Sequence, residues 1–132
     1  MFTRPQISDT ATVRNLLWDA KIQFILRSIR TVFGMRSVRV LDVGCGTGKI
    51  TIPVANCGHR VTAVDIDQSC CRHLLELVRQ RGITSVSVLC ADITELHMEC
   101  CFDVVIAADV LEHIPISPIK VLERLRGLTS ST

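Results

Sequence analysis

The sequence predicts an α/β fold of three layers, in which an open parallel sheet lies between helices. The first observation is that short β-branched segments alternate with segments of helical periodicity between residues 38 and 126. The second is that the strand segments are nearly continuous in apolar residues, which is typical of parallel strands buried on both faces. The third is the length of 132 residues, 48% of them hydrophobic, which suits one domain with a substantial core. We therefore expect one domain over residues 1–132, made of a helix over 10–33 and a core over 38–126.

The first helix rests on an apolar repeat with steps of three and four residues. The repeat consists of Trp18, Ile22, Ile25, Ile29 and Val32. These positions share one helical face. Residues 8–10 are N-cap candidates, and Gly34 is a candidate C-terminal stop.

The other elements alternate, and glycine or polar residues separate them. Strands are expected over 38–43, 60–64, 85–89 and 102–107, and helices over 49–56, 68–81 and 116–128. Right-handed crossovers should join the strands, so that their carboxyl ends meet at one edge of the sheet.

The segment LDVGCGTGKI, residues 41–50, places glycines at 44, 46 and 48 directly after the first strand. Glycine permits positive φ and has no side chain, so a ligand can rest directly on this backbone. The carboxyl ends of strands are where open α/β sheets bind ligands. The spacing differs from the dinucleotide motif, which requires glycine where Lys49 stands. It also differs from a Walker A loop, because Ile50 follows the lysine and the loop is too short.

LDVGCGTG resembles the first motif of the S-adenosylmethionine-dependent methyltransferases with the Rossmann-like fold. Three further segments resemble that family in the same order: VTAVDID (61–67), CADI (90–93) and FDVVIAADVLEHI (102–114). The V-L-E-H ending is common in the ubiquinone-biosynthesis-like and small-molecule branches. The resemblance implies strand order 3-2-1-4, S-adenosyl-L-methionine as cofactor, and methyl transfer to a small-molecule acceptor that the sequence does not name.

The resemblance also implies a set of cofactor-binding residues along the strand ends. They are Asp42, Gly44, Cys45, Gly46, Gly48, Asp65, Ile66, Asp92, Ile93 and Ala108. Asp65 would accept hydrogen bonds from a ribose diol, and Asp92 would lie near the adenine amino group. Asp42 would fix the glycine loop and face the methionine end, while Ala108 would contribute backbone only. Each carboxylate also has a purely structural interpretation as a strand-end acid, a helix cap or a turn former.

Methyl transfer is an in-line displacement, in which the protein mainly aligns the reactants and excludes water. A base is needed only if the acceptor must lose a proton. His113 is the best candidate because imidazole titrates near neutral pH, and Asp109 and Glu112 are rivals.

Members of the family have three more strands, in the order 5-7-6, and these are missing from the expected elements. The strand over 102–107 would then be an apolar edge without a ladder partner, which favours self-association or a partner chain. Two other functions stay open. One is a non-catalytic methyltransferase-like subunit or fragment that acts through a partner. The other is an NAD-dependent oxidoreductase, which Lys49 and the continuing match after residue 90 disfavour.

The composition constrains partners and compartment. A net charge of +2 gives no argument for nucleic acid or membrane binding, although nucleic-acid and protein acceptors stay open. No segment has the ~20 apolar residues of a membrane span, and no signal-peptide core precedes Thr10. We expect a cytoplasmic protein whose seven cysteines are mostly small buried hydrophobes. The run from His97 to Cys101 lacks a CxxC pair, so no metal site is expected.

Overall fold

The computed structural model describes residues 10–98 and 101–129, and the chain divides into two compact units, Met1–Gly34 and Met35–Thr132. In the first unit, α1 (Thr10–Phe33) covers the range that the sequence predicts. It ends at Gly34, which has a φ of 67° and donates its N–H to the Arg30 carbonyl at 2.8 Å. Val32 is exposed although the apolar repeat includes it. The N-cap candidates at residues 8 and 9 lie outside the described residues.

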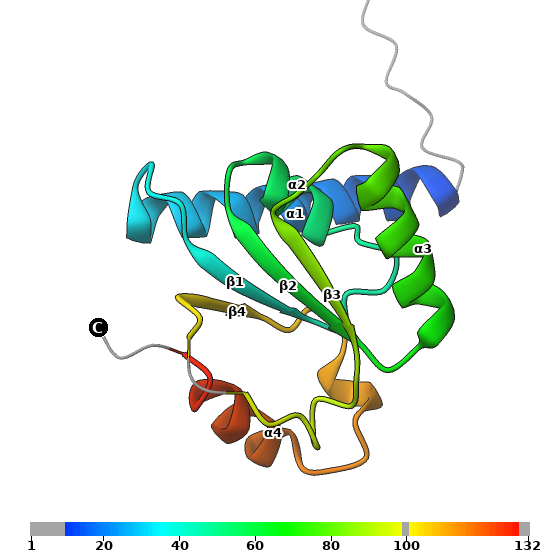
Figure 1. Ribbon diagram of the computed structural model, residues 1–132, viewed down its shortest axis with the longest axis vertical. Coiled ribbons are helices and arrows are strands. Elements are labelled where there is room, and N and C mark those ends of the chain that lie inside the picture. Colours follow the sequence, from blue (N-terminus) through cyan, green and yellow to red (C-terminus); the bar gives the residue numbers. More distant parts are fainter. Residues whose placement is uncertain (1–9, 99–100, 130–132) are drawn as a thin grey trace, which may run out of the picture. The chain divides into compact units, whose positions relative to one another are not determined.

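The second unit contains a sheet of four parallel strands, β1 (Arg39–Val43), β2 (Arg60–Asp65), β3 (Val86–Cys90) and β4 (Val104–Ile106). Their order is β3-β2-β1-β4 (Figure 1), so the predicted fold class and strand order are confirmed. Two crossovers lead outward from β1 to β2 and β3, and the chain then returns to pair β4 with the other side of β1. The chain therefore changes direction in the sheet beside the carboxyl end of β1, where a crevice forms in such folds.

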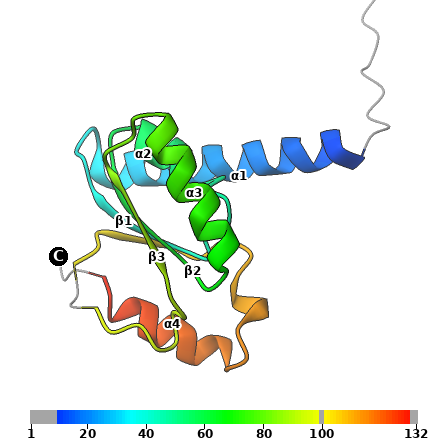
Figure 2. The ribbon, with the colours of Figure 1, turned by 45° about the vertical axis from the view of Figure 1, so that its right-hand side comes forward.

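Helices cover both faces of this sheet. The short α2 (Thr51–Asn56) and α3 (Gln68–Gln80) lie on one face, and α4 (Pro118–Arg126) lies on the other (Figures 1 and 2). Side chains alternate between the faces, as the strand period requires. Leu41 and Val43 belong to the apolar cluster that includes α4 residues, while Ala63 packs in the cluster with α3 residues.

The starts of two helices differ from the sequence-based expectation, and the start of a third agrees with it. Helix α2 begins at Thr51 instead of Lys49, because Gly48 still belongs to a turn in which its N–H donates to the Cys45 carbonyl. Helix α4 begins at Pro118, after a single 3-10 turn, η1 (Leu111–His113). Helix α3 begins as expected, since the Asp67 carboxylate accepts hydrogen bonds from the backbone N–H groups of residues 69 and 70.

The strand expected over 102–107 is shorter than predicted, and its outer edge is not wholly unpaired. On the side that faces β1, the Asp103 carboxylate accepts the N–H of Arg39 at 2.8 Å, whereas a regular ladder would use backbone groups alone. Phe102 forms a parallel bridge with Thr129 and donates its N–H to the Leu128 carbonyl at 3.2 Å. The expectation of a fully unpaired edge is therefore wrong at Phe102, because the chain turns after α4 and returns beside the start of β4.

Two further observations concern the described ranges only. No helix in them is both long and apolar enough to cross a membrane. Within the same residues, no three His, Cys, Asp or Glu side chains form a group that could hold a metal ion, and Cys100 lies outside them.

Candidate functional site

A cavity of about 290 Å³ opens at the carboxyl ends of the strands. Each of the four strands contributes to its wall, either with its last residues or with the loop that follows it. The lining residues are Val43, Gly44, Val64, Asp65, Ile66, Ala91, Asp92, Ile93, Asp109, Val110, His113, Ile114 and Pro115. The second unit thus forms the crevice that its strand order predicts.

The three glycines of the turn after β1 have three different surroundings, although all have positive φ. A Cβ at Gly44 would lie 2.5 Å from Cγ2 of Val110, and a Cβ at Gly48 would lie 2.5 Å from Cδ1 of Leu74. Gly44 and Gly48 are therefore required by packing within the protein. A Cβ at Gly46 would meet no atom within 4 Å. Gly46 is therefore the glycine of the turn with open space beside it, although neither Gly46 nor Gly48 is among the residues that line the cavity.

Asp65, the last residue of β2, holds the glycine turn in place. Its Oδ2 accepts the N–H of Gly46 at 2.8 Å, and its Oδ1 accepts the N–H of Asp67 at 2.8 Å. The carboxylate also lines the cavity. Each carboxylate oxygen has two lone pairs, so Asp65 can accept further hydrogen bonds from a ligand while it keeps both backbone donors.

Asp42 lies beneath the turn, on the α2 side of the sheet, and is only 2% exposed. Its Oδ2 accepts a hydrogen bond from the Thr51 hydroxyl at 2.6 Å, which joins β1 to the first residue of α2. Burial raises the pKa of Asp42 to about 6; the Thr51 hydrogen bond opposes this rise and the nearby Asp65 charge adds to it. The structure thus places Asp42 as a support of the turn, outside the residues that line the cavity.

Cys45 and Ala108 also lie outside the cavity lining. The Cys45 side chain is buried in the cluster with Ile52 and Leu74, and its thiol lies 3.7 Å from the Gly46 carbonyl oxygen. Burial raises the pKa of the Cys45 thiol well above its usual range, and the Asp42 and Asp65 charges add to the effect. This thiol is therefore neutral and acts in packing.

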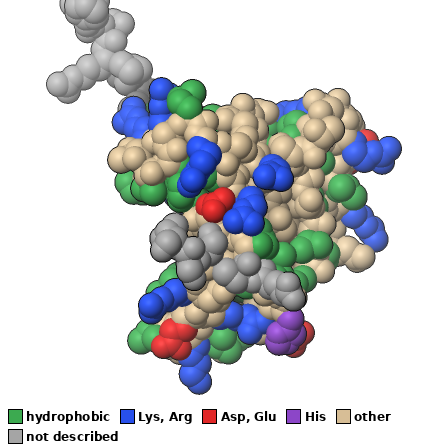
Figure 3. All heavy atoms as spheres, turned by 60° about the vertical axis from the view of Figure 1, so that its left-hand side comes forward, with side chains coloured by type: hydrophobic (Ala, Val, Ile, Leu, Met, Phe, Trp, Pro, Cys, Tyr) green, Lys and Arg blue, Asp and Glu red, His purple; other side chains and the backbone are tan. Residues whose placement is uncertain are grey.

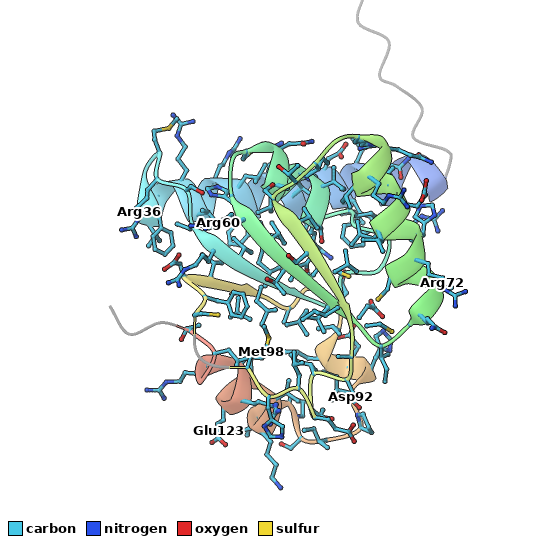
Figure 4. All side chains as sticks on the ribbon, in the orientation of Figure 1. Arg36, Arg60, Arg72, Asp92, Met98 and Glu123 are labelled. Atoms are coloured by element: carbon cyan, nitrogen blue, oxygen red, sulfur yellow. The ribbon has the colours of Figure 1, made fainter. Side chains whose placement is uncertain are left out.

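Asp92 and Ile93 form the cavity wall beyond β3. The Asp92 Oδ1 accepts the N–H and the hydroxyl of Thr94 at 2.9 and 2.7 Å, which closes a local turn. Both hydrogen bonds lower the pKa of Asp92, and the bond from the Thr94 hydroxyl has the larger effect. Figure 4 shows Asp92 beyond the end of β3, on the side of the sheet where α4 lies. The Oδ1 atom of Asp92 therefore forms a turn, as the purely structural interpretation predicts. The residue also lines the cavity.

The Arg124 side chain of α4 forms hydrogen bonds with the loop after β3, which lies far from it in the sequence. Its Nε donates to the Ile93 carbonyl at 2.8 Å, and its second guanidinium nitrogen donates to the Leu96 carbonyl. A planar guanidinium can satisfy two carbonyls at once, which fixes the path of the chain after β3. Sequence reasoning missed Arg124, because no local pattern connects residues 31 positions apart.

The loop after β4 completes the cavity. Asp109 has a φ of 54°, the sole left-handed non-glycine residue in the described ranges, and such strain concentrates at ligand sites. Val110 fills the space that Gly44 leaves free. The His113 ring lines the cavity, its side chain is 76% exposed, and its Nε2 lies 3.6 Å from Oε1 of Glu112. Val110, Ile114 and Pro115 were missed as wall residues, although their position just after a strand end is a usable signal.

The charge of the cavity favours some ligands over others. Three carboxylates line it, from Asp65, Asp92 and Asp109, and none of the described lining residues is Lys or Arg. The remaining wall is largely aliphatic. Such a site suits a flat, partly apolar ligand with hydroxyl or amino donors and a positive charge, and it disfavours a pyrophosphate.

Known proteins are similar in sequence to this chain. A family described as "Methyltransferase domain" matches residues 40–131. Ubiquinone biosynthesis O-methyltransferase from Rickettsia felis is 34% identical over 95 residues, covering 71% of this chain and 38% of that protein. The enzyme of the same name from Bradyrhizobium diazoefficiens is 30% identical over 96 residues, with 73% and 38% covered. The chain thus spans about two fifths of the length of these curated relatives.

Solved structures share the fold. Coclaurine N-methyltransferase bound to N-methylheliamine and SAH is 28% identical with a TM-score of 0.64, over 86% of this chain and 33% of that one. The [4+2]-cyclase SpnF is 27% identical with a TM-score of 0.66, over 71% and 35%. Magnesium protoporphyrin IX methyltransferase from Synechocystis, with SAM bound, has a TM-score of 0.74 over 98% and 62%, and at 20% identity it supports the fold alone. Since the family match covers most of the chain and the sheet order and glycine turn agree with it, this chain belongs to the methyltransferase domain family, class I, with a Rossmann-like fold.

Proposed function

We propose that this chain binds S-adenosyl-L-methionine in the strand-end cavity and serves a methyl transfer to a small-molecule acceptor. One observation carries the proposal: the Asp65 carboxylate, which lines the cavity, accepts a hydrogen bond from the N–H of Gly46, a glycine with open space beside it. A nucleoside can rest on such a backbone while its ribose hydroxyls donate to the carboxylate. The acidic wall is compatible with a sulfonium and adverse to a pyrophosphate.

Each residue of the predicted set has a role in this proposal. Asp65 accepts from the ribose, Asp92 lies toward the adenine, and Ile66 and Ile93 supply apolar wall. Asp42 and Cys45 act from beneath, by fixing the turn that Gly44, Gly46 and Gly48 permit, and Ala108 contributes backbone. We propose that residues 38–126 form the cofactor-binding core and that the helix over 10–33 belongs to the same domain.

The bound cofactor supplies a methyl group on a positively charged sulfur, which makes that methyl electrophilic. The protein's part is to hold the reactants in line and to exclude water. We propose His113 as the base for an acceptor that must lose a proton, because its ring borders the cavity and its exposure allows proton exchange with solvent. Asp109 and Glu112 are the alternatives.

We extend the proposal to the acceptor and to partner chains. The relatives named above include ubiquinone biosynthesis O-methyltransferases, so a small-molecule acceptor is the preferred class. Figure 3 shows both Lys or Arg and Asp or Glu side chains on the surface, and a net charge of +2 gives no argument for a nucleic-acid acceptor. We also propose self-association, or a partner chain, along β4 and the apolar groove beside it, which Val105, Leu111 and Leu122 line. A cytoplasmic location stays a prediction from the sequence.

A second function has specific support. The similarity to a [4+2]-cyclase indicates that the fold also serves proteins named for other reactions. A cofactor-binding chain without methyl transfer, acting as a subunit or fragment, is therefore the second candidate. The NAD-dependent alternative is disfavoured by the carboxylates that line the cavity.

Titration calorimetry of the whole chain with S-adenosylmethionine, S-adenosylhomocysteine and NAD tests the proposal. We expect the first two to bind and NAD not to bind. Asp65→Ala should weaken binding on the order of 10- to 100-fold, since hydrogen bonds to a charged group contribute about 1.5–3 kcal/mol. Asp67→Ala is the matched control, because Asp67 caps α3 and lies outside the cavity lining.

The Asp65 variant also loses the anchor of Gly46, so a second ligand pair isolates the ribose contact. Methylthioadenosine should lose more affinity in Asp65→Ala than its 2′,3′-dideoxy analogue does, because release of the turn affects both ligands and loss of the diol contact affects only the first. Equal losses for both ligands would contradict a role for Asp65 at the diol. Methyl transfer to a panel of small acceptors then separates the enzyme from the cofactor-binding subunit.

A further inference from the structure

Two cysteines meet directly behind the wall of the cavity. Cys71 lies in the first turn of α3, next to Arg72, which Figure 4 labels, and Cys90 is the last residue of β3. The Cys71 sulfur lies 3.5 Å from the Asp65 carbonyl oxygen and 3.8 Å from that of Leu89. The Cys90 sulfur lies 3.6 Å from the carbonyl oxygen of Ile66. Both side chains thus lie at the junction of β2, β3 and α3: the Cys71 sulfur contacts the carbonyl of Leu89, the residue before Cys90, and the Cys90 sulfur contacts the carbonyl of Ile66, the residue after Asp65.

The same carbonyl groups belong to the cavity wall. Asp65 and Ile66 line the cavity, and the Asp65 carbonyl also accepts the N–H of Ala91, another lining residue, at 2.9 Å. Asp65 and Cys90 are paired in the register of β2 and β3. A change in the distance between the two sulfurs must therefore move the segments that carry Asp65, Ile66 and Ala91.

The two thiols differ in access. Cys71 is buried, whereas Cys90 is exposed. Burial, the hydrogen bond to Cys90 and the charges nearby raise the pKa of Cys71 to about 11, so it is a poor first nucleophile. An oxidant therefore reaches Cys90 first, and Cys71 is placed to react second.

We propose that Cys71 and Cys90 form a peroxide-sensitive dithiol whose oxidation to a disulfide regulates the cavity. The Cys90 thiolate attacks a hydrogen peroxide oxygen, so that an S–O bond forms, the O–O bond breaks and hydroxide leaves. The Cys71 sulfur then attacks the Cys90 sulfur; the S–S bond forms, the S–O bond breaks, and the second hydroxide leaves as water with the Cys71 proton. In total two thiols are oxidised, and one peroxide is reduced to two waters. A small dithiol reductant reverses the change by exchange.

The disulfide holds the two sulfurs at a bond length of about 2.05 Å. The start of α3 and the end of β3 must approach each other, and the wall between Ile66 and Ala91 becomes stiffer and narrower. On the proposed function, on which this consequence for binding rests, oxidation weakens binding of the cofactor. The coupling expected between two such sites is on the order of 10-fold.

The bond itself is tested without any ligand. The whole chain is reduced, treated with a small excess of hydrogen peroxide at low protein concentration, and its intact mass is measured. Cleavage after arginine and glutamate should give residues 61–72 linked to residues 82–95, a pair that contains Cys70, Cys71 and Cys90. Cys71→Ser should abolish the link, and the matched control Cys70→Ser should retain it. A link that survives Cys71→Ser, or no loss of two hydrogen atoms in the parent, overturns the proposal.

The effect on the cavity has two readouts. Amide exchange around residues 65–71 and 86–93 should slow in the oxidised parent and should not change in peroxide-treated Cys71→Ser; equal exchange in both overturns the regulatory role. Calorimetry should show S-adenosylhomocysteine binding about 10-fold more weakly to the oxidised form. If the reduced protein does not bind S-adenosylhomocysteine at all, the proposed function fails. The peptide mapping and the amide exchange then still decide whether the dithiol proposal holds.

Discussion

Gly46→Ala should distinguish the glycine that we propose faces the ligand from the two glycines that packing requires. The added methyl meets no atom of the protein within 4 Å, so its cost comes from φ of 54°. A left-handed residue with a side chain costs about 1–2 kcal/mol, and the loss of chain entropy in the unfolded state offsets about 0.4–1 kcal/mol of that. The net loss of folding free energy should be about 1 kcal/mol.

Gly48→Ala should cost more, because its methyl would lie 2.5 Å from Cδ1 of Leu74 and 3.3 Å from Cγ1 of Ile52. Overpacking of this kind adds about 1–3 kcal/mol to the same backbone strain. Urea unfolding of both variants measures the difference directly, since each kcal/mol moves the midpoint by up to about 1 M for a domain of this size.

Binding should rank the two variants in the opposite order. The methyl at position 46 occupies the space in which we propose that the ligand rests, and it should reduce the affinity for S-adenosylhomocysteine on the order of 10- to 100-fold. Gly48→Ala, measured where it is still folded, should retain more affinity than Gly46→Ala. The reasoning is refuted if Gly46→Ala binds like the parent, or if it destabilises the fold as much as Gly48→Ala.

Three other variants test the surroundings of the site. Burial raises the pKa of Asp42 from 3.8 to about 6, so the folded protein holds a proton that the unfolded chain releases between these values. Stability should therefore fall by about 3 kcal/mol as pH rises through that window, and urea unfolding of Asp42→Asn should show a flatter profile. Arg124→Ala should speed amide exchange over residues 91–98 and weaken cofactor binding, whereas the control Arg126→Ala, at an exposed neighbouring position, should alter neither. Unchanged amide exchange in Arg124→Ala would show that the Arg124 hydrogen bonds do not hold the loop after β3 in place. Leu122→Lys, at a 51% exposed position in the groove beside β4, should shift light scattering toward the monomer across a concentration series, and unaltered association would exclude that groove.

The parts of the fold that local sequence encodes were predictable. Asp67 caps α3 because its side chain reaches N–H groups only two and three residues ahead, and such short-range bonding can be inferred from order alone. The strand order followed from the resemblance to a known family, and the observed sheet confirms it. The range of β4 was predicted too long, because its ends depend on Arg39 and Leu128, which lie far away in the sequence.

The candidate site was predictable in its place and less so in its construction. The motif identified the turn, but Gly44 is shaped by Val110, more than sixty residues later, and no periodicity encodes that contact. Arg124 likewise reaches the loop after β3 from α4. Side chains that act across the fold can be found only when the strands are already in register.

Asp65 shows how one residue can combine a structural role with the ligand role that we propose for it. Its two oxygens accept N–H groups from the glycine turn and from the start of α3, so the carboxylate fixes the distance between them before any ligand arrives. A ribose that donates to the remaining lone pairs meets an acceptor whose position is already set, and the entropy of ordering it does not reduce the affinity. The same bonds connect the turn at Gly46 with the segment that carries Cys71, whose sulfur lies against the Asp65 carbonyl. If the proposed disulfide forms, its strain would reach the cavity side of Asp65 through this one residue, and no domain movement would be needed for the cavity to respond.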